Sequence, residues 1–188
     1  ELKQYQQFRF PKRQKDWLSG RFVGKSLIKA VVFEADSILL NQLTIQNEPG
    51  GAPYPQYNQS RLNGSLSLSH RDSFAAAAWC NDEDVTIGID LEAIETKSTG
   101  FIEDYFSKGE AEVVLTLPVE QRDVAASLLW SGKEAILKAL KIGLRVDTRK
   151  LIFEVPDIKR KESWSKLTVL ESPGGADNFQ LFWKCIGD

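Results

Sequence analysis

Hydrophobic positions recur at helical spacing in three stretches of the chain. Residues 16–32 predict a helix with Arg21, Lys25 and Lys29 along one side. The apolar positions of this helix fall on its other side: Trp17, Leu18, Leu27, Ile28 and Val31. The stretch 101–114, FIEDYFSKGEAEVV, is also predicted to be helical.

The third helical stretch is LLWSGKEAILKAL, residues 128–140, which spaces Trp130, Glu134 and Lys138 four residues apart on one stripe. Gly143 is predicted to end this helix. The segment also has a simpler interpretation, in which Ser131 and Glu134 form a capping box at a helix start. Glu134 and Lys138 would then be an ordinary surface ion pair. The segment alone leaves both interpretations open.

Other stretches alternate between apolar and polar residues, as strands do. SLSLSH (65–70) and SFAAAAWC (73–80) predict a hairpin, a charged turn follows at 81–84, and VTIGIDLE (85–92) predicts a third strand. Prolines and glycines cluster in QNEPGGAPYPQYN (46–58), which predicts a loop, and residues 164–185 predict a closing hairpin. Short antiparallel strands interrupted by helices favour an α+β fold over a parallel sheet.

Composition narrows the class of protein. The chain has 188 residues, of which 42% are hydrophobic and 27% are charged, as in an ordinary globular protein. Because no apolar run is long enough to span a bilayer and no secretion signal is visible, we expect a cytoplasmic protein with no membrane partner. Cys80, Cys185 and the single His70 support neither a disulfide framework nor a zinc site.

The charge is small overall but unevenly placed. A net charge of −2 argues against nucleic-acid binding, whereas the stretch KRQKDWLSGRFVGK (12–25) is strongly basic. This cluster is a candidate anion site, and the alternative is a solvated helix face.

Two carboxylates point to the same face of the predicted third strand. Asp90 and Glu92 are two residues apart, so their charges repel unless a cation lies between them, and oxygen ligands suit Mg²⁺. Gly88 is expected to leave space on the same face. An exposed acidic strand face would give the same pattern, so these residues alone do not establish a metal site.

Together, these motifs resemble a known family. IGIDLE, the helical segment 101–114 and WSGKEAILK occur in the order found in the phosphopantetheinyl transferases, whose signature is (V/I)-G-(V/I)-D-x-E followed by W-(S/T)-x-K-E-(A/S)-x-x-K. The chain resembles the surfactin-synthetase-type branch, whose basic helix is similar to KRQKDWLSGR and whose strand end is similar to SLSH. The resemblance runs from Lys12 to Glu154.

The resemblance implies transfer of 4'-phosphopantetheine from coenzyme A to a serine hydroxyl of an apo acyl or peptidyl carrier protein, which releases adenosine 3',5'-bisphosphate. It implies that Asp90, Glu92 and Glu134 hold Mg²⁺ against the pyrophosphate. Glu134 is the expected base, and Lys138 and His70 are expected to neutralise phosphate oxygens. The other expected coenzyme A contacts are Ser69, Lys12, Arg13, Arg21 and Lys25.

The family fold implied is an α+β pseudodimer of two similar halves, each a small antiparallel sheet packed with helices. The halves are predicted at 1–83, with the basic helix and the SLSH strand, and at 84–188, with the IGIDLE strand, the WSGKEAILK helix and the closing hairpin. A fused pseudodimer is expected to be a monomer. Two other classes stay open, an inactive carrier-protein-binding module and another Mg²⁺-dependent phosphotransfer enzyme.

Overall fold

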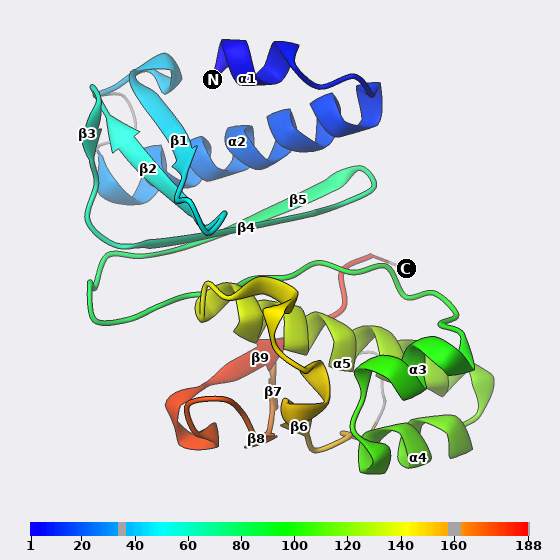
Figure 1. The fold of residues 1–188 in the computed structure, drawn as a ribbon. Coiled ribbons are helices and arrows are strands. Elements are labelled where there is room, and N and C mark those ends of the chain that lie inside the picture. Colours follow the sequence, from blue (N-terminus) through cyan, green and yellow to red (C-terminus); the bar gives the residue numbers. More distant parts are fainter. Residues whose placement is uncertain (34–36, 158–162, 188) are drawn as a thin grey trace. The chain divides into compact units, whose positions relative to one another are not determined.

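The computed structural model describes residues 1–33, 37–157 and 163–187. They form helices and small antiparallel sheets (Figure 1), which confirms the predicted α+β class. The chain divides into two compact units, which are described in turn. The first unit consists of Glu1–Leu91 and Ala135–Gly143, and the second of Glu92–Glu134 and Leu144–Asp188.

The first unit begins with two helices, α1 (Leu2–Gln6) and α2 (Pro11–Val32). Helix α2 starts five residues before the predicted start at Asp16, because Pro11 occupies the first helical position, where proline needs no hydrogen-bond partner. The predicted apolar side is partly wrong, since Leu18 and Val31 are 46% and 56% exposed.

The buried line of α2 consists instead of Gly20, Gly24 and Ile28. A Cβ atom on Gly24 would lie only 2.6 Å from Ile45 Cδ1 and 3.0 Å from a Leu68 methyl group. Glycine therefore lets the strands approach the helix closely, which a pattern of large apolar residues does not reveal. Ile28 packs with Ile38 and Leu43 in the hydrophobic cluster of this unit, together with partly buried residues that include Trp79.

A three-stranded antiparallel sheet follows a 3₁₀ turn, η1 (Leu40–Gln42). Its strands are β1 (Leu43–Asn47), β2 (Pro53–Tyr57) and β3 (Ser60–Arg61), in the order β1-β2-β3. The prediction of a loop over 46–58 is therefore wrong for β2. The Pro55 carbonyl accepts a hydrogen bond from Leu62 N at 3.0 Å, on the side of β3. Since N and C=O of one strand residue face the same side, Pro53 and Pro55 lack donors on the side away from β1.

The predicted hairpin is confirmed as β4 (Ser65–Arg71) and β5 (Phe74–Cys80), with Ser67 opposite Ala78. Helix α2 packs on both strands. The predicted charged turn is present, but the prediction of a third strand at residues 85–92 is wrong. Their backbone amides donate to side chains of β4 instead of pairing with a neighbouring strand.

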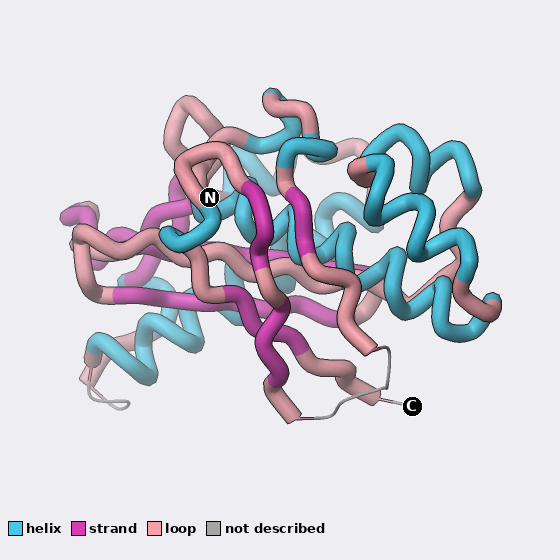
Figure 2. The backbone as a smooth tube through the Cα atoms, turned by 90° about the horizontal axis from the view of Figure 1, so that it is seen from below, coloured by secondary structure: helices cyan, strands magenta, loops and turns pink. Residues whose placement is uncertain are grey.

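The helices of the second unit are α3 (Thr99–Tyr105), α4 (Lys108–Thr116) and α5 (Val119–Ala139), whose last five residues belong to the first unit. Figure 2 shows them as cyan tubes. The predicted helix at 101–114 is broken between α3 and α4, where Ser107 and Glu110 form a true capping box. The capping box predicted at Ser131 and Glu134 is wrong, because both residues lie inside α5.

Helix α5 ends before the predicted stop at Gly143. Lys141 has a left-handed backbone with φ of 58°, and its N–H donates to Lys138 O. Ile142 N donates to Leu137 O, which completes a Schellman motif with Lys141 in the position that glycine usually takes.

Short strands complete the second unit. Strand β6 (Ile152–Phe153) pairs with β8 (Val169–Glu171), and β7 (Ser165–Leu167) pairs with β9 (Leu181–Trp183). Three 3₁₀ turns connect the elements, η2 (Gly143–Arg145), η3 (Thr148–Lys150) and η4 (Ala176–Asn178). The closing hairpin predicted at 164–185 is present as the antiparallel pair β7 and β9. Strand β8, which lies between them in the sequence, pairs with β6 instead.

Candidate active site

In the first unit, Asp90, Ser69 and Lys138 form a hydrogen-bonded cluster. Lys138 Nζ lies 2.7 Å from Asp90 Oδ1 and 3.0 Å from Ser69 Oγ, and the Ser69 hydroxyl donates to Asp90 Oδ1 at 2.9 Å. Lys138 also donates to the Ile89 carbonyl at 3.1 Å, so all three ammonium protons have partners. The structure thus brings together three of the residues predicted from separate motifs.

The second oxygen of Asp90 is buried and has no hydrogen-bond partner among the described residues. The Asp90 side chain is only 6% exposed. An unpartnered carboxylate oxygen in such a place is costly, and a bound cation would compensate for the lost hydration. Asp90 therefore fits a metal ligand, with Oδ1 held by protein groups and Oδ2 available.

Three serine hydroxyls of β4 hold the segment that carries Asp90. Ile87 N donates to Ser65 Oγ at 3.2 Å, Ile89 N to Ser67 Oγ at 3.0 Å, and Leu91 N to Ser69 Oγ at 3.2 Å. All three serines are buried, with 5%, 2% and 5% exposure. We call this arrangement the serine ladder.

Ser69 is fully engaged within this arrangement. Its hydroxyl donates to Asp90 and accepts from both Lys138 and Leu91 N, which uses its donor and both lone pairs. A contact from Ser69 or Lys138 to a phosphate oxygen, as predicted, requires an exchange of one of these partners.

We expected Gly88 to leave open space beside Asp90, but the structure shows no such space. A Cβ atom at this position would lie 1.9 Å from Ala135 O and 2.9 Å from Ala139 N. Glycine is required at this position because the last turns of α5 pass directly over the backbone and leave no room for a side chain. The expectation of space for a ligand at Gly88 is therefore wrong.

The second unit contains Glu92 and Glu134. Trp130 Nε1 donates to Glu92 Oε1 at 3.2 Å, and Lys97 Nζ lies 4.0 Å from Glu92 Oε2. The Trp130 ring has edge contacts with Phe101 and Tyr105, at centroid distances of 5.1 and 5.0 Å. Trp130 thereby orients the Glu92 carboxylate, while Glu134 is half-buried on α5, four residues after Trp130.

Lys133, inside the WSGKE motif, is completely buried. Its ammonium group lies 2.9 Å from Glu110 Oε2 and donates to the carbonyls of Thr148 and Leu151. Burial lowers the pKa of Lys133, and the Glu110 carboxylate partly opposes this shift. Glu110 also accepts from Phe153 N at 2.9 Å, so the pair joins α4, α5 and β6. This role of Lys133 was not predicted from the sequence, although its place beside Glu134 in the WSGKE motif is a signal that could have suggested it.

The predicted phosphate contact His70 lies at the end of β4 with a side chain that is 45% exposed. Its Nε2 is 3.7 Å from Asp16 Oδ2 of α2, a contact that becomes an ion pair when the imidazole is protonated. The role of His70 towards phosphate stays a prediction.

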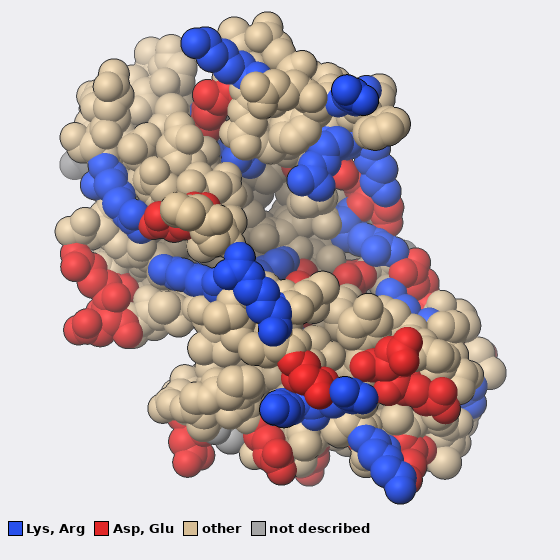
Figure 3. All heavy atoms as spheres, viewed as in Figure 1, with Lys and Arg blue, Asp and Glu red and all other residues tan. Residues whose placement is uncertain are grey.

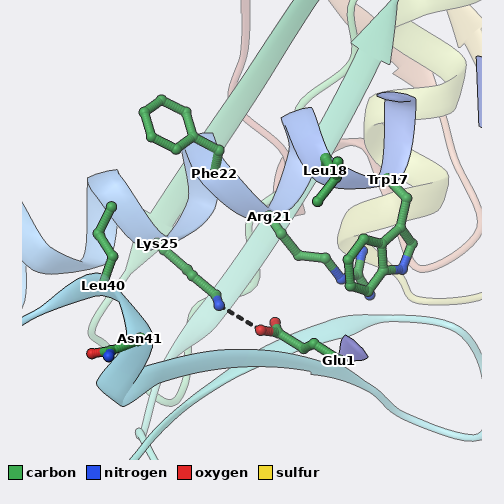
Figure 4. A pocket seen from close by; sticks show the side chains of 8 residues that line it. All are labelled: Glu1, Trp17, Leu18, Arg21, Phe22, Lys25, Leu40 and Asn41. Atoms are coloured by element: carbon green, nitrogen blue, oxygen red, sulfur yellow. Dashed lines mark hydrogen bonds and ion pairs between the residues drawn. The ribbon is translucent and has the colours of Figure 1, made fainter. Parts of the chain in front are cut away.

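The basic residues of α2 fall into two groups. Lys12 and Arg13 are exposed in the first turn, where Figure 3 shows basic side chains gathered. Arg21 and Lys25 instead line a hollow of about 280 Å³ together with Glu1 and Trp17 (Figure 4). Lys12 and Arg13 therefore lie in a different environment from Arg21 and Lys25, although all four belong to α2.

Arg21 and Lys25 already have partners within the hollow. The Arg21 guanidinium lies 3.8 Å above the Trp17 ring and donates to Asn47 Oδ1 at 2.9 Å. Lys25 Nζ is 2.5 Å from Glu1 Oε2. Burial lowers the pKa of Arg21, whereas the Glu1 carboxylate raises it. In the described part of the chain, Arg21 Nε and Trp17 Nε1 are buried donors without a hydrogen-bond partner.

The predicted carboxylate set is divided between the units, with Asp90 in the first and Glu92 and Glu134 in the second. Within residues 1–33, 37–157 and 163–187, no group of three or more His, Cys, Asp or Glu side chains is arranged to hold a metal ion. The Mg²⁺ site therefore stays a proposal. Among the same residues, no helix is long and apolar enough to cross a membrane.

Comparison with known proteins agrees with the motifs. Residues 86–173 match the family model of the 4'-phosphopantetheinyl transferase superfamily. The chain is 28% identical to 4'-phosphopantetheinyl transferase psf-1 of Bacillus pumilus over 122 residues, which are 65% of this chain and 50% of that protein. It is 27% identical to 4'-phosphopantetheinyl transferase HetI of Nostoc sp. over 148 residues, 77% of this chain and 59% of that protein.

These matches confirm the resemblance found in the sequence, and the chain is similar to the 4'-phosphopantetheinyl transferase superfamily. The matched region contains Asp90, Glu92, Glu134 and Lys138. The chain spans about half the length of psf-1 and 59% of that of HetI.

Proposed function

We propose that the protein transfers the 4'-phosphopantetheine group of coenzyme A to a serine hydroxyl of an apo acyl or peptidyl carrier protein, with Mg²⁺ as the metal ion. The observation that carries the proposal is Asp90, whose Oδ1 is held by Ser69 and Lys138 while the buried Oδ2 has no hydrogen-bond partner among the described residues. Asp90 and Lys138 lie within the region that matches the transferase superfamily, whereas Ser69 precedes it.

We propose Asp90, Glu92 and Glu134 as the residues that hold the metal ion. When bound, Mg²⁺ would neutralise charge on the pyrophosphate that is attacked. Trp130 supports this assignment for Glu92 because it fixes one oxygen of that carboxylate. Glu134 is also the proposed base that removes the proton of the carrier serine, and adenosine 3',5'-bisphosphate is the leaving group.

Lys138 and His70 are the proposed phosphate contacts. All three Lys138 donors have partners, so Lys138 would have to exchange Ser69, Ile89 O or Asp90 for a phosphate oxygen. His70 is half-exposed and therefore accessible to a substrate. A protonated imidazole beside Asp16 would add a positive charge to the site.

The adenosine end of coenzyme A is assigned to α2. The unpartnered donors Arg21 Nε and Trp17 Nε1, noted above among the described residues, favour an acceptor in this hollow. Lys12 and Arg13 are exposed in the first turn, where the helix dipole also favours an anion. We propose that these residues and Lys25 share the 3'-phosphate.

The pseudodimer of two similar halves, at 1–83 and 84–188, is also a proposal. It is supported by the presence of helices and small antiparallel sheets in both compact units, although these units have other bounds. A monomeric state and a cytoplasmic location remain expectations from the sequence.

The central experiment is labelling of an apo carrier protein with a fluorescent coenzyme A analogue. We expect labelling that stops when chelator removes Mg²⁺ and returns when Mg²⁺ is added. Asp90→Ala should lower turnover by orders of magnitude. Asp84→Ala is the matched control, because Asp84 is an exposed carboxylate six residues earlier. Binding of the carrier without labelling would favour the inactive module, and full activity of Asp90→Ala would refute the metal assignment.

A second substrate tests the assignment of Arg21. Arg21→Ala should raise KM for coenzyme A about tenfold or more, because a charge-assisted hydrogen bond is lost. The same change should affect dephospho-coenzyme A, which lacks the 3'-phosphate, much less. Equal penalties on both substrates would remove Arg21 from the 3'-phosphate site.

A further inference from the structure

We infer that Ser65 and Ser67 are positioning residues for Asp90, acting through the backbone of residues 87–91. Neither serine is assigned a contact with Asp90, and neither belongs to the predicted site. Their hydroxyls accept the amides of Ile87 and Ile89, in place of the carbonyls that a neighbouring strand would supply. The catalytic part of this inference rests on the proposed function, whereas the structural part does not.

The spacing of the serines matches that of the amides. Side chains at alternate positions of β4 point to one face, and alternate amides of an extended segment point to one side. Ser65, Ser67 and Ser69 are two residues apart, as are their donors. Three bonds therefore form only in one register, and a slip of one residue would break all three.

The two faces of β4 have different partners. Leu68 points towards α2, where a Cβ atom on Gly24 would touch its methyl groups. The serines, which alternate with the leucines, therefore occupy the opposite face of the strand. The segment 87–91 crosses this face, where its amides bond to the serine hydroxyls and none of the described strands pairs with it.

The segment is also held from its other side. Lys138 Nζ donates to Ile89 O, and the backbone of Ala135 comes close enough to Gly88 to exclude a Cβ atom. Residues 87–91 are thus confined between the serine face of β4 and the last turns of α5. This confinement places the Asp90 carboxylate beside Ser69 and Lys138.

Of the three serines, Ser67 best distinguishes a positioning role from a direct contact with Asp90. Its hydroxyl accepts from Ile89, next to Asp90, and is 2% exposed. A displaced catalytic group loses activity steeply, even when the displacement is small. We therefore expect Ser67→Ala to lower kcat about tenfold or more while KM for coenzyme A changes little.

Amide hydrogen exchange of the full chain, followed by NMR, tests the ladder without any substrate. Ser67→Ala should speed exchange of the Ile89 amide about tenfold or more, and Ser65→Ala should do the same for Ile87. Ser67→Thr, which keeps the hydroxyl, should restore both slow exchange and kcat. Ser65→Ala also provides an independent test if Ser67→Ala fails to fold.

Ser127→Ala is the matched control. Ser127 is another buried serine whose hydroxyl accepts a backbone amide, that of Glu95, at 3.4 Å. This change should speed exchange at Glu95 and leave Ile87 and Ile89 unchanged.

The two readouts separate failure of the ladder from failure of the proposed function. Unchanged exchange at Ile89 in Ser67→Ala would overturn the ladder, and faster exchange with unchanged kcat would overturn the positioning role. A wild-type protein that labels no carrier would refute the proposed function, and exchange at Ile87 and Ile89 would then decide the ladder alone.

Discussion

Replacing Gly88 with alanine tests the close approach between residues 87–91 and the end of α5. The added Cβ atom would lie 1.9 Å from Ala135 O, whereas ordinary contact begins at 3.4 Å, so the backbones must separate by about 1.5 Å. The three hydrogen bonds that Lys138 of α5 donates to Ser69, Ile89 O and Asp90 are 2.7 to 3.1 Å long, and such a separation breaks them. With about 1 kcal/mol for each of three bonds, we expect a loss of about 2 to 4 kcal/mol in unfolding free energy.

Urea unfolding at 25 °C, followed by circular dichroism, measures this loss. Gly109→Ala is the control, because Gly109 lies in α4 and a Cβ atom there would meet nothing within 4 Å. Alanine should stabilise that helix by about 0.5 to 1 kcal/mol. If Gly88→Ala were as stable as the wild type, the packing of α5 over Gly88 would be wrong. An open ligand space at Gly88 would then regain support.

Three further predictions concern the rest of the fold. Lys133→Met should cost about 3 to 5 kcal/mol in urea unfolding, because it leaves Glu110 buried without its cation; a loss below 1 kcal/mol would contradict this. Lys141→Gly should raise stability by about 1 kcal/mol, since φ is 58°, and a lower melting temperature would contradict it. Arg149 hydrogen bonds lower the pKa of Asp147 from 3.8 to about 2. The contribution of the Asp147–Arg149 interaction to folding stability should be complete above pH 3.8 and should disappear as the pH falls through 2. NMR should detect this titration of the Asp147 carboxyl group, and Asp147→Asn should lack it.

Local patterns predicted elements correctly where the hydrogen-bond partners are close in sequence. The hairpin of β4 and β5 is one case, because Ser67 and Ala78 face each other across a short turn. The alternation of residues 85–92 wrongly implied a strand. An alternating pattern does not specify whether amides bond to carbonyls or to side chains, and here they bond to serines about twenty residues earlier.

Tertiary packing explains the other differences. The stripe of large residues on α2 was misleading because the helix packs through Gly20 and Gly24, which only the nearby strands reveal. The capping box at Ser131 failed because α5 begins at Val119, far earlier than the local pattern suggested.

For the site, three of the residues selected from the motifs lie in contact, Asp90, Ser69 and Lys138, while their roles stay predictions. The grouping of Asp90 with Glu92 and Glu134 stays a prediction. The roles of Ser65 and Ser67 depend on the position of a distant segment, which the sequence pattern alone did not supply.

The prolines of β2 have a consequence for contacts with other chains. Strand β3 pairs with β2 at Gln56 and Tyr57, and Leu62 N donates to the Pro55 carbonyl, which leaves Pro53 of that edge without a strand partner among the described residues. A strand from another molecule that approached this edge would find no N–H donor at Pro53 or Pro55. Pro53 and Pro55, which led to the wrong prediction of a loop, therefore protect β2 from edge-to-edge aggregation.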